Sequence, residues 1–222
     1  MSRAHVLLAV VAVFFFASSS LAQAALPTYT FDGGTPAEQA QVGKALAASS
    51  FDWSIIGRSV TVHIGDYDGD YATPGDVYIS ASLLDSGQFA WGTVQHEFAH
   101  QVDFALLSDA DRAQLQQALG VGTWFGDGTT PLPHSALGAE RFASELAWAY
   151  WQSPNNSMSP GYIGVESNGM PVAQFRALVT QLLGVAPAAA TTPGAVPAGT
   201  VLAAPKVTAP AAKAKSKKTT RR

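Results

Sequence analysis

The chain has 222 residues, of which 47% are hydrophobic, including five tryptophans and 11 phenylalanines, and it contains no cysteine. This length suits one catalytic domain with appended segments, and the apolar content is sufficient for a core. Disulfide bonds are excluded, and no repeat at solenoid spacing is visible. The formal net charge of −3 hides a division between an acidic central segment and a basic C-terminal one.

Residues 1–24 are predicted to form a secretory signal peptide. Arg3 and His5 precede the apolar run Val6–Ala17, and Ala22-Gln23-Ala24 has the small-x-small pattern of a cleavage site. A membrane anchor fits less well, because the apolar run is much shorter than the roughly 20 residues of a spanning helix. We therefore expect a protein that is secreted or associated with the cell envelope, without a transmembrane anchor after cleavage.

Residues 25–184 are predicted to form the folded domain. Thr35-Pro36-Ala37-Glu38 has the N-cap, first-turn proline and acid of a capping box, which predicts a helix to about Ala48. Residues 58–64 then alternate apolar and polar side chains, as a half-buried strand does. His63 lies on the polar face of this strand, where it is interpreted as an exposed residue without a ligand role.

The acidic stretch Asp66–Asp70 resembles the start of a calcium loop. The positions of the loop glycine and the closing glutamate hold Tyr71 and Val77, so a solvated acidic turn is the preferred interpretation. A short strand is expected at 77–80. At a sheet edge above the following helix, such a strand can bind an extended peptide through main-chain hydrogen bonds.

His96-Glu97-Phe98-Ala99-His100 is a His-Glu-x-x-His motif in a segment predicted to be helical. At about 100° per residue, His96 and His100 lie one turn apart on the same side of the helix, so both imidazoles can bind one metal ion. Glu97 lies at the edge of that face, where it can contact a metal-bound water without being a ligand. The alternative is a surface helix with two solvated histidines. It is disfavoured by an apolar stripe on the opposite side, formed by Trp91, Val94, Phe98, Val102 and Ala105.

Two further segments separate this helix from the next one. Ser108-Asp109-Ala110-Asp111 is predicted to cap a helix that ends at Gly120, with its charges on a solvated face. Residues 122–138 form a long stretch rich in glycine and proline. This stretch is expected to build a wall of a cleft, because it also carries Trp124, Phe125 and His134.

The third metal ligand is sought in a predicted helix at 140–150. Glu145 lies about 140° around the helix from Glu140 and four residues after Arg141, which suits a surface ion pair. Glu140 shares its face with the small residues Ser144 and Ala147, which would let another helix approach closely. We therefore prefer Glu140 as the ligand, with Glu145 as the alternative.

A final helix is predicted from Pro171 to Leu183, where apolar residues recur at helical spacing and indicate core packing. Residues 185–222 are almost entirely Ala, Pro, Thr, Val, Gly and Lys, with seven basic residues and no acid, and we expect a disordered tail. The segment 25–184 holds five basic and all 16 acidic residues, five minus 16, a formal charge of −11. The tail is interpreted as a solvated terminus or as a contact to an anionic envelope surface; nucleic acid is not an expected partner.

His96-Glu97-Phe98-Ala99-His100-Gln101-Val102-Asp103, followed by Glu140-Arg141-Phe142-Ala143, resembles the gluzincin zinc metalloproteases. The resemblance is to their small, lethal-factor-like catalytic domains, and it covers roughly residues 59–151. It implies an α+β fold with an edge strand over the active-site helix and a mostly helical C-terminal half. It also implies His96, His100 and Glu140 as ligands, Glu97 as base and Asp103 as a residue that supports a ligand. Members of the family often carry a tyrosine shortly before the ligand glutamate, and this chain offers His134 there instead.

These residues predict a secreted zinc metalloendopeptidase with one Zn²⁺ per chain. The zinc activates a water for attack on the peptide bond of a peptide or protein substrate, and Glu97 acts as general base. His134 is the expected donor to the oxyanion. The alternatives are an exported zinc-binding module without proteolysis and an interaction protein held to the envelope by its tail. Retention of Glu97 favours the peptidase, because an inert site does not need a base.

Overall fold

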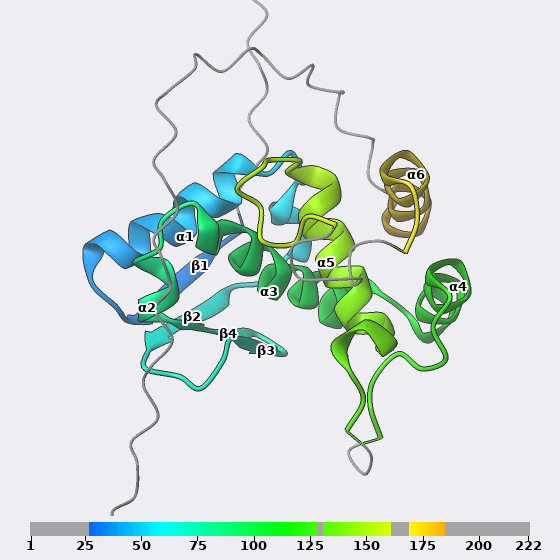
Figure 1. Ribbon diagram of the computed structural model, residues 1–222, viewed down its shortest axis with the longest axis horizontal. Helices are drawn as coiled ribbons and strands as arrows, with labels where there is room; N and C mark the ends of the chain where they lie inside the picture. Colours follow the sequence, from blue (N-terminus) through cyan, green and yellow to red (C-terminus); the bar gives the residue numbers. More distant parts are fainter. Residues whose placement is uncertain (1–26, 128–130, 161–168, 185–222) are drawn as a thin grey trace, which may run out of the picture. The chain divides into compact units, whose positions relative to one another are not determined.

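The computed structural model describes residues 27–127, 131–160 and 169–184 (Figure 1). The predicted signal peptide (1–24) and basic tail (185–222) lie outside the described residues. None of the helices in the described ranges is long and apolar enough to cross a membrane.

Four strands form one mixed sheet in the order β1-β2-β4-β3. Their bounds are Tyr29–Gly33 (β1), Val60–Gly65 (β2), Tyr71–Thr73 (β3) and Asp76–Ser80 (β4). β1, β2 and β4 are parallel to one another, whereas β3 is antiparallel to β4. The strand predicted at 77–80 is confirmed as β4, but its predicted place at a sheet edge was wrong, since β4 lies between β2 and β3. The edge strand beside β4 is β3, which is too short for its hydrophobic pattern to reveal a strand.

Helices make up most of the remaining described chain, which confirms a mixed α+β architecture that is mostly helical after β4. The α-helices are α1 (Pro36–Ala48), α2 (Ala81–Leu84), α3 (Phe89–Leu106), α4 (Asp109–Leu119), α5 (Gly138–Tyr150) and α6 (Val172–Leu183). Two 3₁₀ turns, η1 (Trp53–Ile56) and η2 (His134–Ala136), complete the set.

The helix ends follow the predicted capping signals. Thr35 and Glu38 form a complete capping box at the start of α1, and Ser108 and Asp111 form another at the start of α4. Gly120 ends α4 with φ at +67°, a left-handed conformation that favours glycine. These boundaries therefore follow from local sequence alone.

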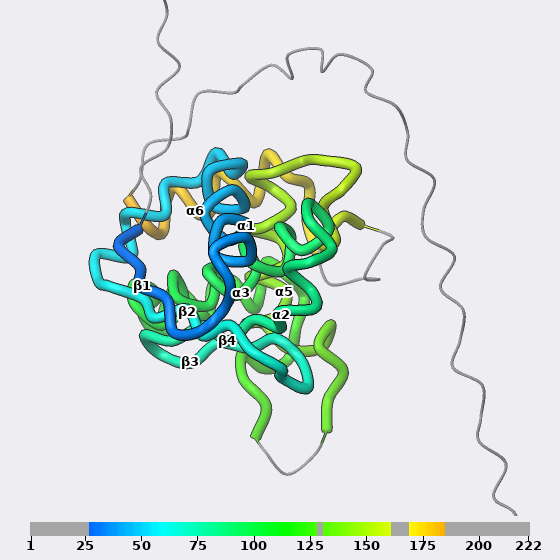
Figure 2. Tube along the Cα trace, turned by 90° about the vertical axis from the view of Figure 1, so that its left-hand side faces the viewer, coloured from blue at the N-terminus to red at the C-terminus, as the bar shows by residue number. Residues whose placement is uncertain are grey.

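The inner face of the sheet packs against α1 and α3, and α3 lies beside α5 (Figures 1 and 2). α1 connects the parallel strands β1 and β2, as a crossover helix does. The alternation predicted for β2 is confirmed, because Val60, Val62 and Ile64 are buried in the core. On the outer face, His63 is not simply exposed: its two ring nitrogens each lie 2.9 Å from a carboxylate oxygen, one of Asp32 and one of Asp76.

α3 is more central than its sequence suggested. Its apolar stripe is confirmed, since Val94 and Phe98 are fully buried, but the opposite side of the helix is buried too. Several polar side chains of the helix are hydrogen-bonded inside the protein instead of facing solvent. Gln95, for example, donates from Nε2 to the backbone oxygen of Ala45 in α1 at 2.7 Å. α3 therefore packs against the sheet, α1 and α5, and the motif histidines lie on this buried helix.

Candidate metal centre

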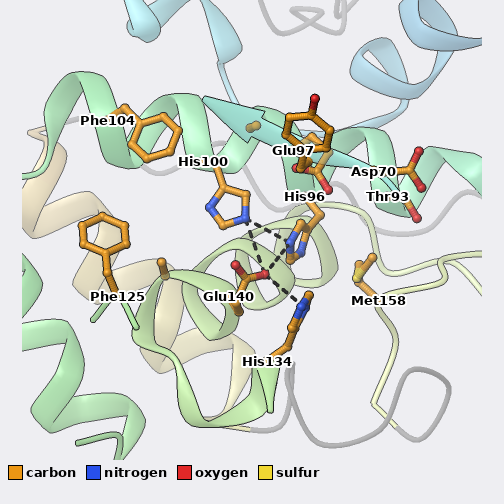
Figure 3. Close-up of a pocket in the computed structure, with 13 residues that line it drawn as sticks. Asp70, Thr93, His96, Glu97, His100, Phe104, Phe125, His134, Glu140 and Met158 are labelled. Atoms are coloured by element: carbon orange, nitrogen blue, oxygen red, sulfur yellow. Dashed lines mark hydrogen bonds and ion pairs between the residues drawn. The ribbon is translucent and has the colours of Figure 1, made fainter. Parts of the chain in front are cut away.

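Three donor atoms from α3 and α5 converge where the two helices pack together (Figure 3). Nε2 of His96 lies 3.1 Å from Nε2 of His100 and 3.2 Å from Oε2 of Glu140. Nε2 of His100 lies 3.6 Å from the same Glu140 oxygen. The helical turn that separates the two histidines and the close packing of α5 on α3 thus bring together the three ligands predicted from the sequence.

The separations of these donor atoms match a zinc site. Zinc binds imidazole nitrogen at about 2.0–2.1 Å and carboxylate oxygen at about 2.0–2.2 Å, so ligand atoms of a tetrahedral site lie about 3.3–3.5 Å apart. The three measured distances run from 3.1 to 3.6 Å around this value. The residue set therefore fits zinc in both chemistry and spacing.

Glu97 is a second acid close to the same donors. Candidate ligand atoms of His96, Glu97 and His100 lie within 4.8 Å of one another, so Glu97 competes with Glu140 for the position of third ligand. Glu140 contacts both imidazole nitrogens directly, whereas Glu97 does so with neither. Glu140 is therefore the acid in direct contact with the two imidazoles, and Glu97 lies beside them.

The pKa values of the cluster follow from its burial and its charges. Burial lowers the pKa of His96, which keeps its imidazole neutral and able to bind a metal. Burial also disfavours charge on His100, but the hydrogen bond with Glu140 and the charge of Glu97 outweigh it and raise the pKa of His100. Burial works to raise the pKa of Glu140, yet hydrogen bonds with His100 and His96 hold it well below its ordinary range. The surroundings therefore favour a neutral His96 and a protonated His100, and metal binding would release the proton of His100.

Burial raises the pKa of Glu97 to about 8. The negative charges of Glu140 and Asp70 act in the same direction, and the positive charge of His100 opposes them. In the metal-free protein Glu97 therefore holds a proton at neutral pH. A cation bound between the histidines would lower this pKa again by direct attraction.

Ser144 supports the site from α5, a role that the sequence reasoning missed. Its hydroxyl lies 3.0 Å from Nδ1 of His96 and is fully buried. It stands one helical turn after Glu140, so one face of α5 presents both the carboxylate of Glu140 and the hydroxyl that contacts His96. The four-residue spacing between Glu140 and Ser144 places both on one face of the helix, but the sequence indicates only that Ser144 is small enough to permit close packing.

Glu145 has a structural role that differs from the predicted surface ion pair. Its side chain is fully buried, and Oε1 accepts the backbone N–H groups of Gly169 and Met170, the second at 3.0 Å. Arg141 donates from Nε to the backbone oxygen of Ser135. The ion-pair interpretation was wrong because residues 169–170, distant in sequence, return to this side of α5.

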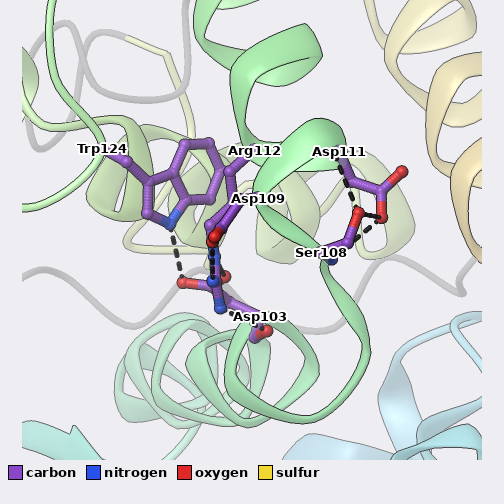
Figure 4. A network of polar contacts seen from close by, with 6 residues as sticks. All are labelled: Asp103, Ser108, Asp109, Asp111, Arg112 and Trp124. Atoms are coloured by element: carbon purple, nitrogen blue, oxygen red, sulfur yellow. Dashed lines mark hydrogen bonds and ion pairs between the residues drawn. The ribbon is translucent and has the colours of Figure 1, made fainter.

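Asp103 also differs from its implied role. Its side chain is fully buried, with Oδ1 accepting from Nε of Arg112 at 2.8 Å and Oδ2 accepting from Nε1 of Trp124 at 2.9 Å (Figure 4). Arg112 also contacts Asp109, so α4 does not carry a purely solvated set of charges. Asp103 therefore anchors α4 and the segment after it to α3, while Ser144 is the residue that contacts a histidine ligand.

A cavity of about 620 Å³ opens over the three donor atoms. Phe104 and Phe125 lie at one end of it, and Asp70, Thr93 and Met158 lie at the other (Figure 3). The predicted wall at 122–138 is confirmed in part, because Phe125 and His134 line the cavity while Trp124 is buried beneath it. His134 lies with Nδ1 3.5 Å from Oε2 of Glu140 and keeps 70% of its side-chain surface exposed, so it reaches the cavity from its rim.

Several lining residues come from segments that carried no sequence signal for the site. Asp70 and Tyr71 reach it from the start of β3, next to the acidic turn. Met158 reaches it from the loop after α5, which packs against α3 at Gly92; a Cβ atom at Gly92 would collide with Asn156. Only the folded arrangement of these loops brings them to the cavity.

Comparison of the chain with models of protein families, with curated proteins and with solved structures gives no match. The chemistry of the site must therefore be inferred from its own residues.

Proposed function

We propose that this protein is a zinc-dependent peptidase of the gluzincin type, with a zincin-like catalytic domain. The observation that carries the proposal is the convergence of His96, His100 and Glu140 at 3.1–3.6 Å, with Glu97 beside them in one cavity. Two imidazoles, one carboxylate and a nearby unliganded glutamate form the residue set of a catalytic zinc site.

His96, His100 and Glu140 would hold the zinc ion. When bound with three protein ligands, zinc supplies a Lewis acid and lowers the pKa of a water at its open position toward about 7. Ser144 keeps the His96 ring oriented through Nδ1, so that Nε2 faces the metal position.

Glu97 is the proton carrier in the proposed reaction. Its carboxylate accepts a proton from the attacking water and later delivers that proton to the nitrogen of the departing amine, so the residue returns to its starting state. Burial raises the pKa of Glu97 to about 8 in the metal-free protein, and a cation held by the two histidines would lower that pKa, so that the carboxylate is available to accept the proton. His134, at the rim, is the candidate donor to the developing oxyanion.

The edge strand β3 supports an extended peptide as the substrate. Tyr71 and Ala72 line the cavity, and β4 is the one described strand that pairs with β3. The outer edge of β3 can therefore pair with a substrate backbone, and this pairing would align a peptide bond over the donor atoms. A neighbouring strand edge favours peptides over small esters or sugars.

The N-terminal sequence supports export of this activity, because residues 1–24 have the pattern of a signal peptide. In this proposal the enzyme acts outside the cell or at its envelope. The basic residues of 185–222 would add weak attraction to anionic surfaces.

The deciding experiment measures metal and activity on the same preparation. Chain purified without chelator should contain one zinc per molecule and cleave members of a degenerate peptide library. A chelator should abolish cleavage, and added zinc should restore it. His96→Ala should contain no zinc and show no cleavage. Wild-type protein that binds no zinc, or that binds zinc but cuts no peptide in the library, would rule out the proposed function.

A further inference from the structure

We propose that Gln101 is a positioning residue that holds the edge strand β3 at a fixed place relative to the metal-binding face of α3. Gln101 follows His100 directly in the sequence, and its side chain is fully buried. The inference rests on the proposed peptidase function, since it concerns the strand that would align an extended substrate.

One carboxamide binds three backbone groups of the turn between β3 and β4. Oε1 of Gln101 accepts the N–H of Gly75 at 2.8 Å. Nε2 donates to the carbonyl oxygens of Thr73 at 2.8 Å and Asp76 at 2.9 Å. Thr73 and Asp76 are also directly opposite each other in the antiparallel pair, so Gln101 binds the hairpin at its turn.

Only an amide can make this set of contacts. The turn presents one donor and two acceptors, and a glutamine side chain offers both kinds of group. A glutamate would place an acceptor against two carbonyl oxygens, and a leucine would leave three backbone groups in a part-buried site without their partner. The geometry therefore depends on the identity of the side chain and not merely on its volume.

The three hydrogen bonds of Gln101, which we call the clamp, are important because β3 is short and lies at the edge of the sheet. β3 spans three residues, and among the described strands only β4 pairs with it. Tyr71 and Ala72 of this strand line the cavity, while the clamp holds its far end at Thr73. Since His100 and Gln101 are neighbours on α3, the hydrogen bonds of Gln101 fix the height of the strand over the donor atoms. A strand released from α3 would present a peptide to the metal centre at the wrong place.

The test compares an extended substrate with a short one on the full chain. The extended substrate is an eight-residue peptide that wild-type protein cleaves, selected from a degenerate library. The short substrate keeps only the two residues on each side of the cleaved bond, so it forms fewer main-chain hydrogen bonds with β3. Gln101→Leu should reduce kcat/KM for the extended peptide roughly 10- to 100-fold, mainly through KM. It should change kcat/KM for the short peptide less than threefold and leave one zinc per chain. Gln101→Glu is a second variant that keeps the test valid if the leucine variant folds poorly. It should also lower the ratio of kcat/KM for the extended peptide to kcat/KM for the short one.

Gln95 provides a matched control. It lies on the same helix next to His96, its side chain is fully buried, and its Nε2 bonds to Ala45 of α1 instead of to the hairpin. Gln95→Leu should lower thermal stability but leave the ratio of kcat/KM between the two peptides at the wild-type value. If Gln95→Leu and Gln101→Leu change this ratio equally, Gln101 has only a structural role and the inference is wrong.

Amide hydrogen exchange supplies a readout that does not depend on activity. In Gln101→Leu, exchange at Gly75 and along β3 should accelerate at least about 10-fold relative to the rest of the sheet, and in Gln95→Leu it should not. Unchanged exchange would overturn the clamp, even if the peptide assays change. If wild-type protein cleaves no peptide of the library, the peptidase proposal and the catalytic role of the clamp are both wrong, and the exchange experiment then decides whether Gln101 holds β3.

Discussion

The hydroxyl oxygen of Ser144 lies 3.0 Å from Nδ1 of His96, on the side of the imidazole ring away from the other donor atoms. Because this contact engages Nδ1, it leaves Nε2 as the nitrogen that points toward His100 and Glu140. α5 therefore contacts the cluster through two residues, Glu140 and, one helical turn later, Ser144. Replacing residues that support metal ligands in this way typically costs about 10- to 100-fold in metal affinity or activity.

Ser144→Ala should accordingly weaken zinc binding about 10- to 100-fold, measured by competition with a chromogenic chelator. Ser49→Ala is a suitable control, since Ser49 is also buried and its hydroxyl accepts the nearby backbone N–H of Phe51. That control should lose some stability without any change in zinc affinity. Equal zinc affinity in wild type and Ser144→Ala would show that the contact does not orient His96.

Glu140→Gln should weaken zinc binding more than roughly 100-fold, because it replaces a ligand and not a supporting group. Glu145→Gln is the matched control on the same helix: its carboxamide can still accept the N–H groups of Gly169 and Met170, so zinc affinity should change less than threefold. Titration of both variants with zinc gives the comparison. The opposite order of effects would assign the ligand role to Glu145.

Glu97→Gln should retain zinc and the fold but lower kcat at least about 10²-fold, and up to about 10⁴-fold, because the proton acceptor is lost. Metal analysis and kinetics on one preparation test both parts. Cleavage near the wild-type rate with zinc still bound would assign the proton transfer to another group.

A pH effect follows for metal-free protein. The folded state raises the pKa of Glu97 from 4.5 to about 8, so between these values the folded protein holds a proton that the unfolded chain has released. Stability therefore falls as pH rises through this window. Glu97→Gln has no such proton, so its gain in melting temperature over wild type should be larger at pH 8 than at pH 5. A constant difference across this range would contradict the raised pKa.

His134→Ala should reduce kcat about 10- to 1000-fold if the imidazole donates to the oxyanion. Its ring lies 3.5 Å from Glu140 and is 70% exposed, so the substitution should disturb packing little. Zinc content should stay at one per chain. Wild-type kcat in this variant would show that His134 is only a residue of the rim.

His63 predicts a separate pH dependence of stability, far from the metal site. Its hydrogen bond with Asp76, reinforced by Asp32, raises the pKa of His63 in the folded protein, although burial opposes this effect. The stabilisation by the protonated ring is fully present below the unfolded pKa of about 6.5 and is lost as pH rises through the higher folded value. His63→Gln should therefore destabilise the domain by about 0.2–1 kcal/mol more at pH 5.5 than at pH 9, as urea denaturation can measure. A larger loss at pH 9 would reverse the assigned sign.

The sequence alone determined the features that depend on residues close together in the chain. The capping boxes of α1 and α4, the alternation in β2 and the helical spacing of His96 and His100 are local patterns, and the structure has each of them. The choice of Glu140 also came from local geometry, because its position around α5 distinguished it from Glu145. A motif whose residues lie one helical turn apart needs no knowledge of the rest of the fold.

Tertiary structure alone decided which distant groups meet. It placed β3 and not β4 at the edge of the sheet. It also set the hydrogen bonds of Asp103 with Arg112 and Trp124 and the contact of Ser144 with His96. It also buried Gln101 of α3, which meets a hairpin that lies 25 to 28 positions earlier in the chain. Hydrogen-bond partners of buried polar groups are set by the packing of whole elements, and a pattern within one element carries no record of that packing.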